Sequence, residues 1–222
     1  MPPDAYTTNF RCWLVALIAL SALIFAHADH TGFTEQQYLK IASEHGSDAE
    51  LRIRKWQDLI HGSERLSERQ KLELVNDFFN GARFVDDINL WRQNDYWATP
   101  LEFLLADAGD CEDFSIAKYF TLRAMGVDNA KLRLTYVKAL NLNQAHMVLA
   151  YYPDSSSTPV ILDNLNKRIK PAQERSDLQP VYSFNAEDLW LARSRNEQLI
   201  AGKARQLGRW LKLNERMLQE LL

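Results

Sequence analysis

The spacing of the apolar side chains changes a little past the middle of this chain of 222 residues. Up to residue 126 they recur at steps of three and four, which is typical of amphipathic helices, whereas in residues 131–139 they alternate with polar residues as in a half-buried strand. The stretches expected to be helical are 34–62 with a break at Gly46, 66–84, 99–105, 111–125, 186–194 and 197–222. The expected strands are 131–139, 145–152, 159–164 and 181–185. Helices followed by neighbouring strands and then by helix predict one α+β domain with an antiparallel sheet and a C-terminal helix.

The first 28 residues have the pattern of a secretory signal peptide. Arg11 precedes 14 uncharged residues, 13–26, and Ala26 and Ala28 provide the small residues of a cleavage point. The uncharged run is shorter than the roughly 20 residues that a membrane span needs, and an uncleaved anchor is the alternative. We expect 1–28 to be removed and the remaining chain to be the exported domain, with no stable membrane span after cleavage.

Charge and cysteine content limit the possible functions. The formal net charge is -3, so the chain lacks the basic excess of a nucleic-acid-binding protein. There are two cysteines, and cleavage after residue 28 removes Cys12. The exported domain, residues 29–222, then contains Cys111 alone and forms no internal disulfide. In an oxidising compartment a lone thiol is either buried as a small apolar side chain or kept for its reactivity.

Cys111 stands in an acidic turn at the start of a predicted helix. The free N–H groups of a helix N-terminus favour a thiolate, but the carboxylates of Asp110, Glu112 and Asp113 oppose one. One interpretation is ordinary capping, with Asp110 at the N-cap and Asp113 at the N3 position. The other is a hard divalent cation, which binds carboxylate oxygens and reverses the local charge. The spacing is not that of an EF-hand loop, and both interpretations stay open at this point.

His146 lies in an apolar strand and is either a satisfied core residue or a general base. The short polar link between residues 145–152 and 159–164 makes these strands hairpin neighbours, so the end of the second lies beside the start of the first. Asp163, at that end, is either a turn former or the group that orients the imidazole. With Cys111 they fit a nucleophile, a base and an orienting acid.

The order of Cys at a helix start, then His and Asp on strands, resembles that of the papain-like and transglutaminase-like superfamily. Within it, "DAGDCEDFSIAKYFTLRAMGV" at 107–127, "AHMVLAYY" at 145–152 and "ILDNLN" at 161–166 resemble the bacterial transglutaminase-like cysteine proteinases, the periplasmic LapG-type proteases. The Gly-Asp-Cys-Glu-Asp run is the most specific part, and the resemblance extends to "DYWATPLEFL" at 95–104. It implies a papain-like/transglutaminase-like fold in which the Cys helix packs on the antiparallel sheet.

The resemblance also implies calcium-dependent proteolysis in the periplasm. Members of the family cleave a large cell-surface adhesin near its N-terminus, at a di-alanine site, and thereby control biofilm attachment. An inner-membrane receptor that senses cyclic di-GMP holds them inactive. Carried over by position, the resemblance implies a catalytic triad of Cys111, His146 and Asp163. It implies calcium ligands at Asp110, Glu112 and Asp113.

Two other functions are compatible with the same residues. A transglutaminase would use the same triad up to the acyl-enzyme, so the sequence does not separate acyl transfer from hydrolysis. A non-enzymatic calcium-dependent binding module would keep Cys111 merely buried. Trp97 is expected to be a core or cleft-wall residue, and the superfamily resemblance suggests a place near the oxyanion site as the alternative.

Overall fold

The computed structural model describes residues 32–194 and 197–220. The chain divides into two compact units, Met1–Lys40 and Ile41–Leu222. The expected signal peptide, residues 1–28, lies outside the described residues, so the start of the exported domain stays a prediction. A search of the described residues reveals no helix with the length and hydropathy of a membrane span.

Within the first unit the structure describes residues 32–40, which contain the beginning of helix α2 (Glu35–His45). Thr34 precedes this helix, and its Oγ1 accepts a hydrogen bond from the Gln37 N–H at 3.3 Å. The ring of Phe33 packs at 5.8 Å from that of Tyr38. A hydroxyl cap and a small aromatic contact therefore stabilise the start of α2.

The second unit contains the helices that the periodicity predicts before residue 126. The helices of this unit are α3 (Ser47–His61), α4 (Glu68–Phe79), α5 (Asp87–Leu90), α6 (Pro100–Ala106), α7 (Cys111–Ala124) and α8 (Gly208–Glu220). Capping explains two of their starts, because Ser67 and Gln70 form a capping box at α4 and Thr99 and Glu102 form one at α6. Gly126, with a φ of +82°, follows α7 in the left-handed conformation that ends a helix.

The strands form a seven-stranded sheet in the order β6-β5-β4-β3-β7-β8-β9, with antiparallel neighbours throughout. Its strands are β3 (Leu132–Ala139), β4 (Gln144–Tyr151), β5 (Val160–Leu162), β6 (Lys170–Pro171), β7 (Leu178–Phe184), β8 (Asp188–Ser194) and β9 (Glu197–Lys203). A separate parallel pair joins β1 (Arg83–Phe84) to β2 (Ala108–Gly109). The predicted antiparallel sheet is confirmed, and the four strands expected from the sequence, β3, β4, β5 and β7, are adjacent to one another in it.

The prediction of helix over 186–194 and from 197 onward is wrong in part. Residues 188–194 and 197–203 form the hairpin β8–β9, and the C-terminal helix begins only at Gly208. A short segment of mixed apolar and polar residues does not distinguish a strand from a helix by its period. Pairing of β8 with β7 and of β9 with β8 selects the strands. Asn185 forms the turn between β7 and β8, because its Oδ1 accepts hydrogen bonds from the N–H groups of Glu187 and Asp188 at 2.9 and 3.0 Å.

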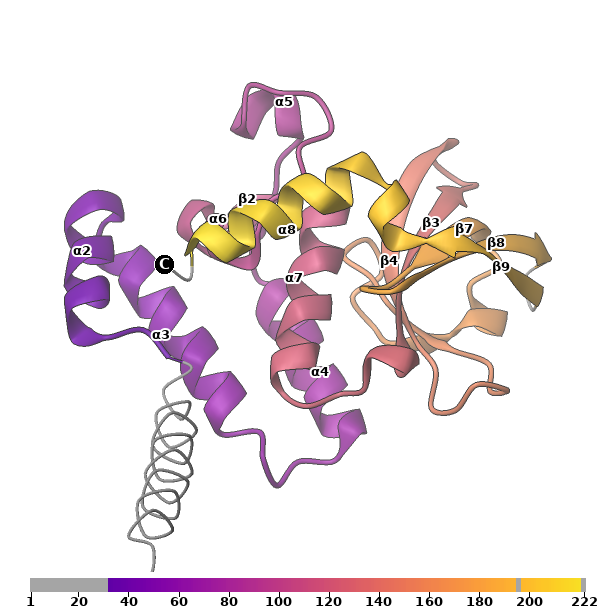
Figure 1. The fold of residues 1–222 in the computed structure, drawn as a ribbon, viewed down its shortest axis with the longest axis horizontal. Coiled ribbons are helices and arrows are strands. Elements are labelled where there is room, and N and C mark those ends of the chain that lie inside the picture. The colour runs from indigo at the N-terminus through magenta and orange to yellow at the C-terminus, as the bar shows by residue number, and fades with distance from the viewer. Residues whose placement is uncertain (1–31, 195–196, 221–222) are drawn as a thin grey trace, which may run out of the picture. The chain divides into compact units, whose positions relative to one another are not determined.

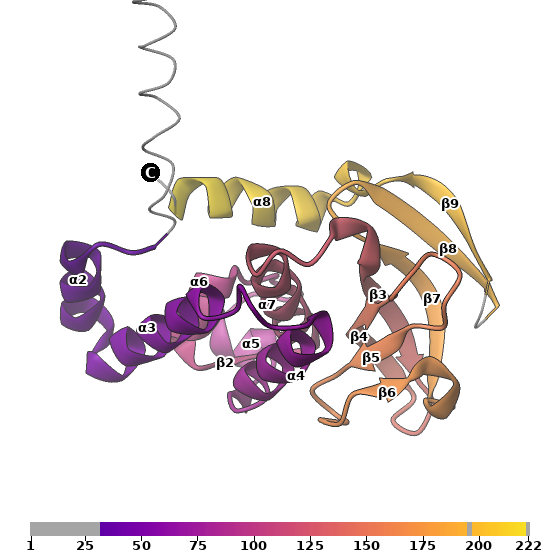
Figure 2. The same cartoon turned by 90° about the horizontal axis from the view of Figure 1, so that it is seen from below.

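Helix α7 lies between the sheet and helices α4 and α6, as both views show (Figures 1 and 2). Ser115 connects it to the sheet, since its Oγ donates to the main-chain oxygen of Met147 on β4 at 3.0 Å. Trp56 of α3 connects it to the helical layer by donating Nε1–H to Thr121 Oγ1 at 2.8 Å. The first residue of α7, Cys111, is thereby held beside the start of β4.

Candidate active site

The turn before α7 is positioned by the β1–β2 pair. Phe84 pairs with Gly109, and the N–H of Val85 donates to the Gly109 oxygen at 2.9 Å. Gly109 has no room for a side chain, because a Cβ there would lie 2.6 Å from the Cβ of Asp113 and 2.8 Å from Cδ2 of Phe103. The backbone at Gly109 therefore packs directly against α7, and this contact fixes the position of the first turn of α7, including Cys111, beside the sheet.

His146 and Asp163 form a direct buried pair. The imidazole Nε2 lies 2.8 Å from Asp163 Oδ1, and the two residues are 2% and 1% exposed. Leu149 pairs with Leu162, so Asp163 follows the last paired residue of β5 and meets His146 diagonally across the hairpin. The predicted proximity is confirmed, although the two residues are diagonal neighbours and not direct partners.

Several groups act on the Asp163 carboxylate. Burial acts to raise its pKa, but the hydrogen bond and charge of His146, the Leu165 N–H and the Arg175 guanidinium outweigh burial and lower the pKa to about 2. Leu165 N–H donates to Oδ1 at 3.0 Å, so the turn-forming role of Asp163 is present as well. The carboxylate is therefore ionised and able to orient the imidazole.

Cys111 and His146 line the same open cavity, which has a volume of about 590 Å³. Aromatic side chains form part of its wall, with Tyr136 and Tyr182 stacked at 5.1 Å. The Cys111 thiol donates to Glu112 Oε2 at 3.0 Å, and among the described residues it makes no hydrogen bond to the His146 ring. The structure thus places Cys111 and His146 in one cavity, while the Cys111 thiol is hydrogen-bonded to Glu112.

The surroundings of Cys111 oppose its ionisation. Burial raises the pKa of the thiol well above its usual value, the charge and hydrogen bond of Glu112 raise it further, and the charge of Asp110 adds to both. The main-chain N–H of Met147 acts in the other direction. The helix N-terminus alone therefore does not make this cysteine a thiolate.

Asp87 also lies beside the acidic turn, a position that the sequence did not predict. One carboxylate oxygen from each of Asp87, Asp110 and Asp113 lies within 4.8 Å of the other two, and Asp110, Cys111 and Glu112 form an overlapping group of the same kind. Asp87 comes from α5, far upstream of Cys111. The Asp86-Asp87 doublet in an irregular segment is its only sequence signal, and doublets of this kind are common at surfaces.

The carboxylates of this cluster fit a hard divalent cation. Oδ1 of Asp87 and Oδ1 of Asp110 are buried without a hydrogen-bond partner. Burial, followed by the charges of neighbouring carboxylates, raises the pKa of Asp87 to about 6 and that of Asp110 to about 10. Burial also raises the pKa of Asp113 well above its usual value, even though the Ala98 N–H donates to it at 2.7 Å. Unpartnered oxygens in a group of mutually repelling carboxylates are what a calcium ion would satisfy.

Trp97 lines the cavity and is 7% exposed. Its ring stacks on Phe184 at 5.6 Å, and its indole N–H donates to Asp95 Oδ1 at 3.0 Å. The cleft-wall interpretation agrees with this position. A contribution to oxyanion binding stays a prediction, and it would require the indole N–H to leave Asp95.

The chain is similar to a family of cysteine proteinases and to solved structures from it. A family model described as "Bacterial transglutaminase-like cysteine proteinase BTLCP" matches residues 33–188. The structure of EGTA-treated LapG from Legionella pneumophila is 45% identical, with a TM-score of 0.73, and the match covers 84% of this chain and 98% of that one. The calcium-bound LapG structure is 44% identical, with a TM-score of 0.71, over 83% of this chain and 99% of that one.

A third structure of Legionella pneumophila LapG agrees, with 44% identity, a TM-score of 0.72 and coverage of 84% of this chain and 98% of that one. The comparison with curated proteins produced no match. The similarity to LapG extends over nearly the whole of each solved chain and confirms the predicted papain-like/transglutaminase-like fold. Because the family model matches more than half of its residues, this chain belongs to the bacterial transglutaminase-like cysteine proteinases and is a cysteine protease of the LapG type.

Proposed function

We propose that the protein is an exported, calcium-dependent endopeptidase that uses Cys111, His146 and Asp163. The observation that supports this most directly is the placement of Cys111 and His146 in one cavity, with His146 bonded to Asp163 at 2.8 Å. Because Nε2 is committed to the carboxylate, Nδ1 is the ring nitrogen left to exchange a proton with the thiol.

The reaction follows from these roles. The thiol proton passes to His146, and the Cys111 sulfur attacks the carbonyl carbon of the scissile peptide bond. The imidazolium returns the proton to the leaving amine, which departs and leaves a thioester on Cys111. His146 then takes a proton from water, whose oxygen attacks the thioester carbon. The bond from this carbon to the Cys111 sulfur breaks, the imidazolium returns the proton to the sulfur, and the new carboxyl end is released. Asp163 keeps the imidazole in the tautomer that both steps need.

Calcium is the proposed cofactor, with Asp110, Glu112 and Asp113 as ligands and Asp87 as a further one. The orphaned oxygens of Asp87 and Asp110 support this proposal, as does the calcium-bound state of one similar LapG structure. Bound calcium supplies positive charge that offsets the carboxylates opposing the Cys111 thiolate.

The proposed substrate is a large cell-surface adhesin, cut near its N-terminus in the periplasm. A cavity walled by Phe84, Trp97, Tyr136 and Tyr182 suits small side chains at the cleavage point, which agrees with a di-alanine site. The signal-peptide pattern of residues 1–28 supports export to the periplasm. We further propose control of biofilm attachment, with an inner-membrane cyclic di-GMP receptor as the inhibitory partner.

The test uses purified residues 29–222 and an N-terminal adhesin fragment containing a di-alanine site. We expect cleavage in calcium, none in excess chelator, and restoration when calcium is added back. The Cys111→Ala variant is expected to be inactive in all three conditions. Cleavage by Cys111→Ala would contradict the proposal, and incorporation of an added amine without chain cleavage would favour acyl transfer instead.

A further inference from the structure

The Asp163 carboxylate has a second buried partner besides His146. Its Oδ2 accepts a hydrogen bond from Arg175 Nη2 at 2.7 Å, whereas Oδ1 faces His146. Arg175 is 3% exposed, so this ion pair is shielded from water. Both oxygens of the carboxylate are therefore committed, and its plane is fixed from two sides.

Arg175 is itself held from its outer side. Its Nε donates to Asp177 Oδ1 at 3.0 Å and its Nη2 to Asp177 Oδ2 at 2.8 Å. The side chain of Asp177 is 35% exposed, so the Asp163–Arg175–Asp177 group extends from the interior to the protein surface. One guanidinium between two carboxylates leaves a net charge of -1, so Arg175 does not cancel the negative charge that faces His146.

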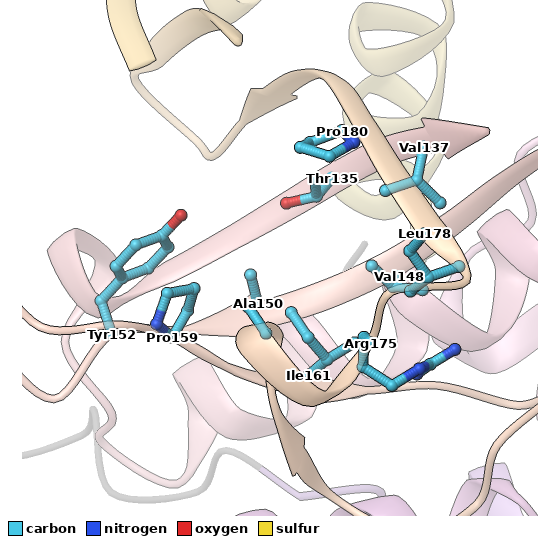
Figure 3. Close-up of a pocket in the computed structure, with 11 residues that line it drawn as sticks. Thr135, Val137, Val148, Ala150, Tyr152, Pro159, Ile161, Arg175, Leu178 and Pro180 are labelled. Atoms are coloured by element: carbon cyan, nitrogen blue, oxygen red, sulfur yellow. The ribbon is translucent and has the colours of Figure 1, made fainter. Parts of the chain in front are cut away.

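The aliphatic part of the Arg175 side chain, its stem, is held in place by the surrounding fold. The residue follows the short 3-10 turn Ala172–Glu174, and its own oxygen accepts from the Leu178 N–H at 3.1 Å. Its stem borders a small apolar cavity of about 50 Å³, together with Val148, Ile161 and Leu178. Figure 3 shows the guanidinium extending away from the middle of this cavity. The stem is packed while the charged end is aimed elsewhere.

A second buried basic side chain near Asp163, Lys118, is linked through Asn80 to a different part of this residue. Lys118 of α7 donates to Asn80 Oδ1 at 2.8 Å, and Asn80 Nδ2 donates to the main-chain oxygen of Asp163 at 2.9 Å. Lys118 thus acts on the backbone of Asp163, whereas Arg175 contacts the carboxylate that orients the base. Lys118 therefore stabilises the main chain around Asp163, whereas Arg175 determines the orientation of the Asp163 carboxylate.

We propose that Arg175 is a positioning residue of the protease, which fixes the Asp163 carboxylate so that Oδ1 stays on His146 Nε2. The inference rests on the proposed triad. Neither the periodicity nor the family motifs point to Arg175, which lies in a polar loop after β6. The orientation of the imidazole is thereby set by a chain of contacts from Asp177 through Arg175 and Asp163.

The test measures kcat and KM of residues 29–222 in saturating calcium for Arg175→Met, Arg175→Lys and the matched control Arg168→Met, an exposed arginine that precedes β6. We expect Arg175→Met to lower kcat by about 10- to 100-fold, with KM within about twofold, as for other residues that orient a ligand or base. Arg175→Lys keeps the charge and should recover part of kcat. Arg168→Met makes the same substitution at an exposed position outside this chain of contacts and should stay within about threefold of the wild type.

A proton NMR spectrum supplies a second readout that a merely structural role would leave in place. The downfield resonance of the His146 Nε2 proton should move or broaden in Arg175→Met, and less so in Arg175→Lys. If Arg175→Met does not fold, the kcat and the resonance of Arg175→Lys decide. Wild-type kcat together with an unmoved resonance in the folded variant would overturn the inference, as would a change in KM alone. An inactive wild type, or an active Cys111→Ala, would instead contradict the proposed function.

Discussion

At the scale of single residues, the reactivity of Cys111 is set by its immediate neighbours. The thiol donates to Glu112, and burial together with the charges of Glu112 and Asp110 raises its pKa. A thiol is a nucleophile only as thiolate, so this arrangement holds the cysteine in its unreactive form. The acidic turn therefore opposes formation of the thiolate in addition to capping the helix.

Removing one opposing charge should make the cysteine more reactive when calcium is absent. In chelator near neutral pH, we expect Glu112→Gln to be alkylated by iodoacetamide about three- to tenfold faster than the wild type, because a lower thiol pKa gives more thiolate. Mass spectrometry of the modified protein measures the rate. Glu73→Gln, at an exposed position of α4, is the matched control and should match the wild type. An unchanged rate in Glu112→Gln would show that Glu112 does not restrain the thiol.

The stabilisation produced by calcium should grow with pH. The raised pKa values of Asp87, about 6, and Asp110, about 10, mean that the fold without metal is most favoured while these groups are protonated. That stability is lost as pH rises through the folded-state values, and bound calcium offsets the loss. We expect the difference in Tm between calcium and chelator to increase from about pH 5 to about pH 8. A difference that stays constant or shrinks would mean that these carboxylates do not bind the ion.

At the scale of secondary-structure elements, a two-residue strand pair positions the catalytic turn. Gly109 of β2 lies against Asp113, so a methyl group at this position would displace that carboxylate or open the β1–β2 pair. We expect Gly109→Ala to lower kcat/KM by about 10-fold or more and to weaken calcium binding, because misplacing the nucleophile by about 1 Å has effects of this size. Calorimetric titration with calcium and the cleavage assay measure the two effects.

The control for this variant is Gly208→Ala at the start of α8. A Cβ at Gly208 meets no atom within 4 Å, so the added methyl group should leave activity and calcium affinity unchanged. Equal effects of the two substitutions would indicate a general loss of stability and would remove the role assigned to Gly109.

Trp210 is a central packing contact of helix α8, which is also held by the buried Leu213 and by a hydrogen bond from Thr99 Oγ1 to Glu220 at 2.5 Å. Trp210 is 3% exposed, stacks on Phe120 at 5.4 Å and meets Phe184 edge-on at 5.3 Å. We expect Trp210→Ala to lower the free energy of unfolding by about 3–5 kcal/mol, measured by urea denaturation. Leu211→Ala, at the neighbouring exposed position, should change it by less than about 1 kcal/mol. Similar values for both would mean that α8 is not anchored through this contact.

At the scale of the whole molecule, the parts that the sequence predicts correctly are those with local signals. Thr99-Pro100 marks the start of α6, Gly126 marks the end of α7, and strict alternation marks β3. The polar link between β4 and β5 defines a hairpin, and the hairpin alone brings His146 and Asp163 together. The contact between His146 and Asp163 was predictable because one short connection places their strands side by side.

The parts that the sequence did not predict depend on contacts between distant segments. Asp87 reaches the acidic turn from α5, and Arg175 reaches Asp163 from a loop with no periodicity. The residue pattern of β8 and β9 predicts a helix, and only the pairing of β8 with β7 shows that the segment is a hairpin. In each case tertiary contacts, which single-residue patterns do not contain, decide the outcome.

In the proposed mechanism His146 is the base for Cys111, and one kinetic comparison tests this role. The measurement is kcat/KM of residues 29–222 on the adhesin fragment in saturating calcium, for the wild type and His146→Ala. Loss of the base should lower kcat/KM by about 10³-fold or more, while circular dichroism and calcium binding stay as in the wild type. A folded, calcium-binding His146→Ala that retains kcat/KM within about tenfold of the wild type would mean that His146 is not the base.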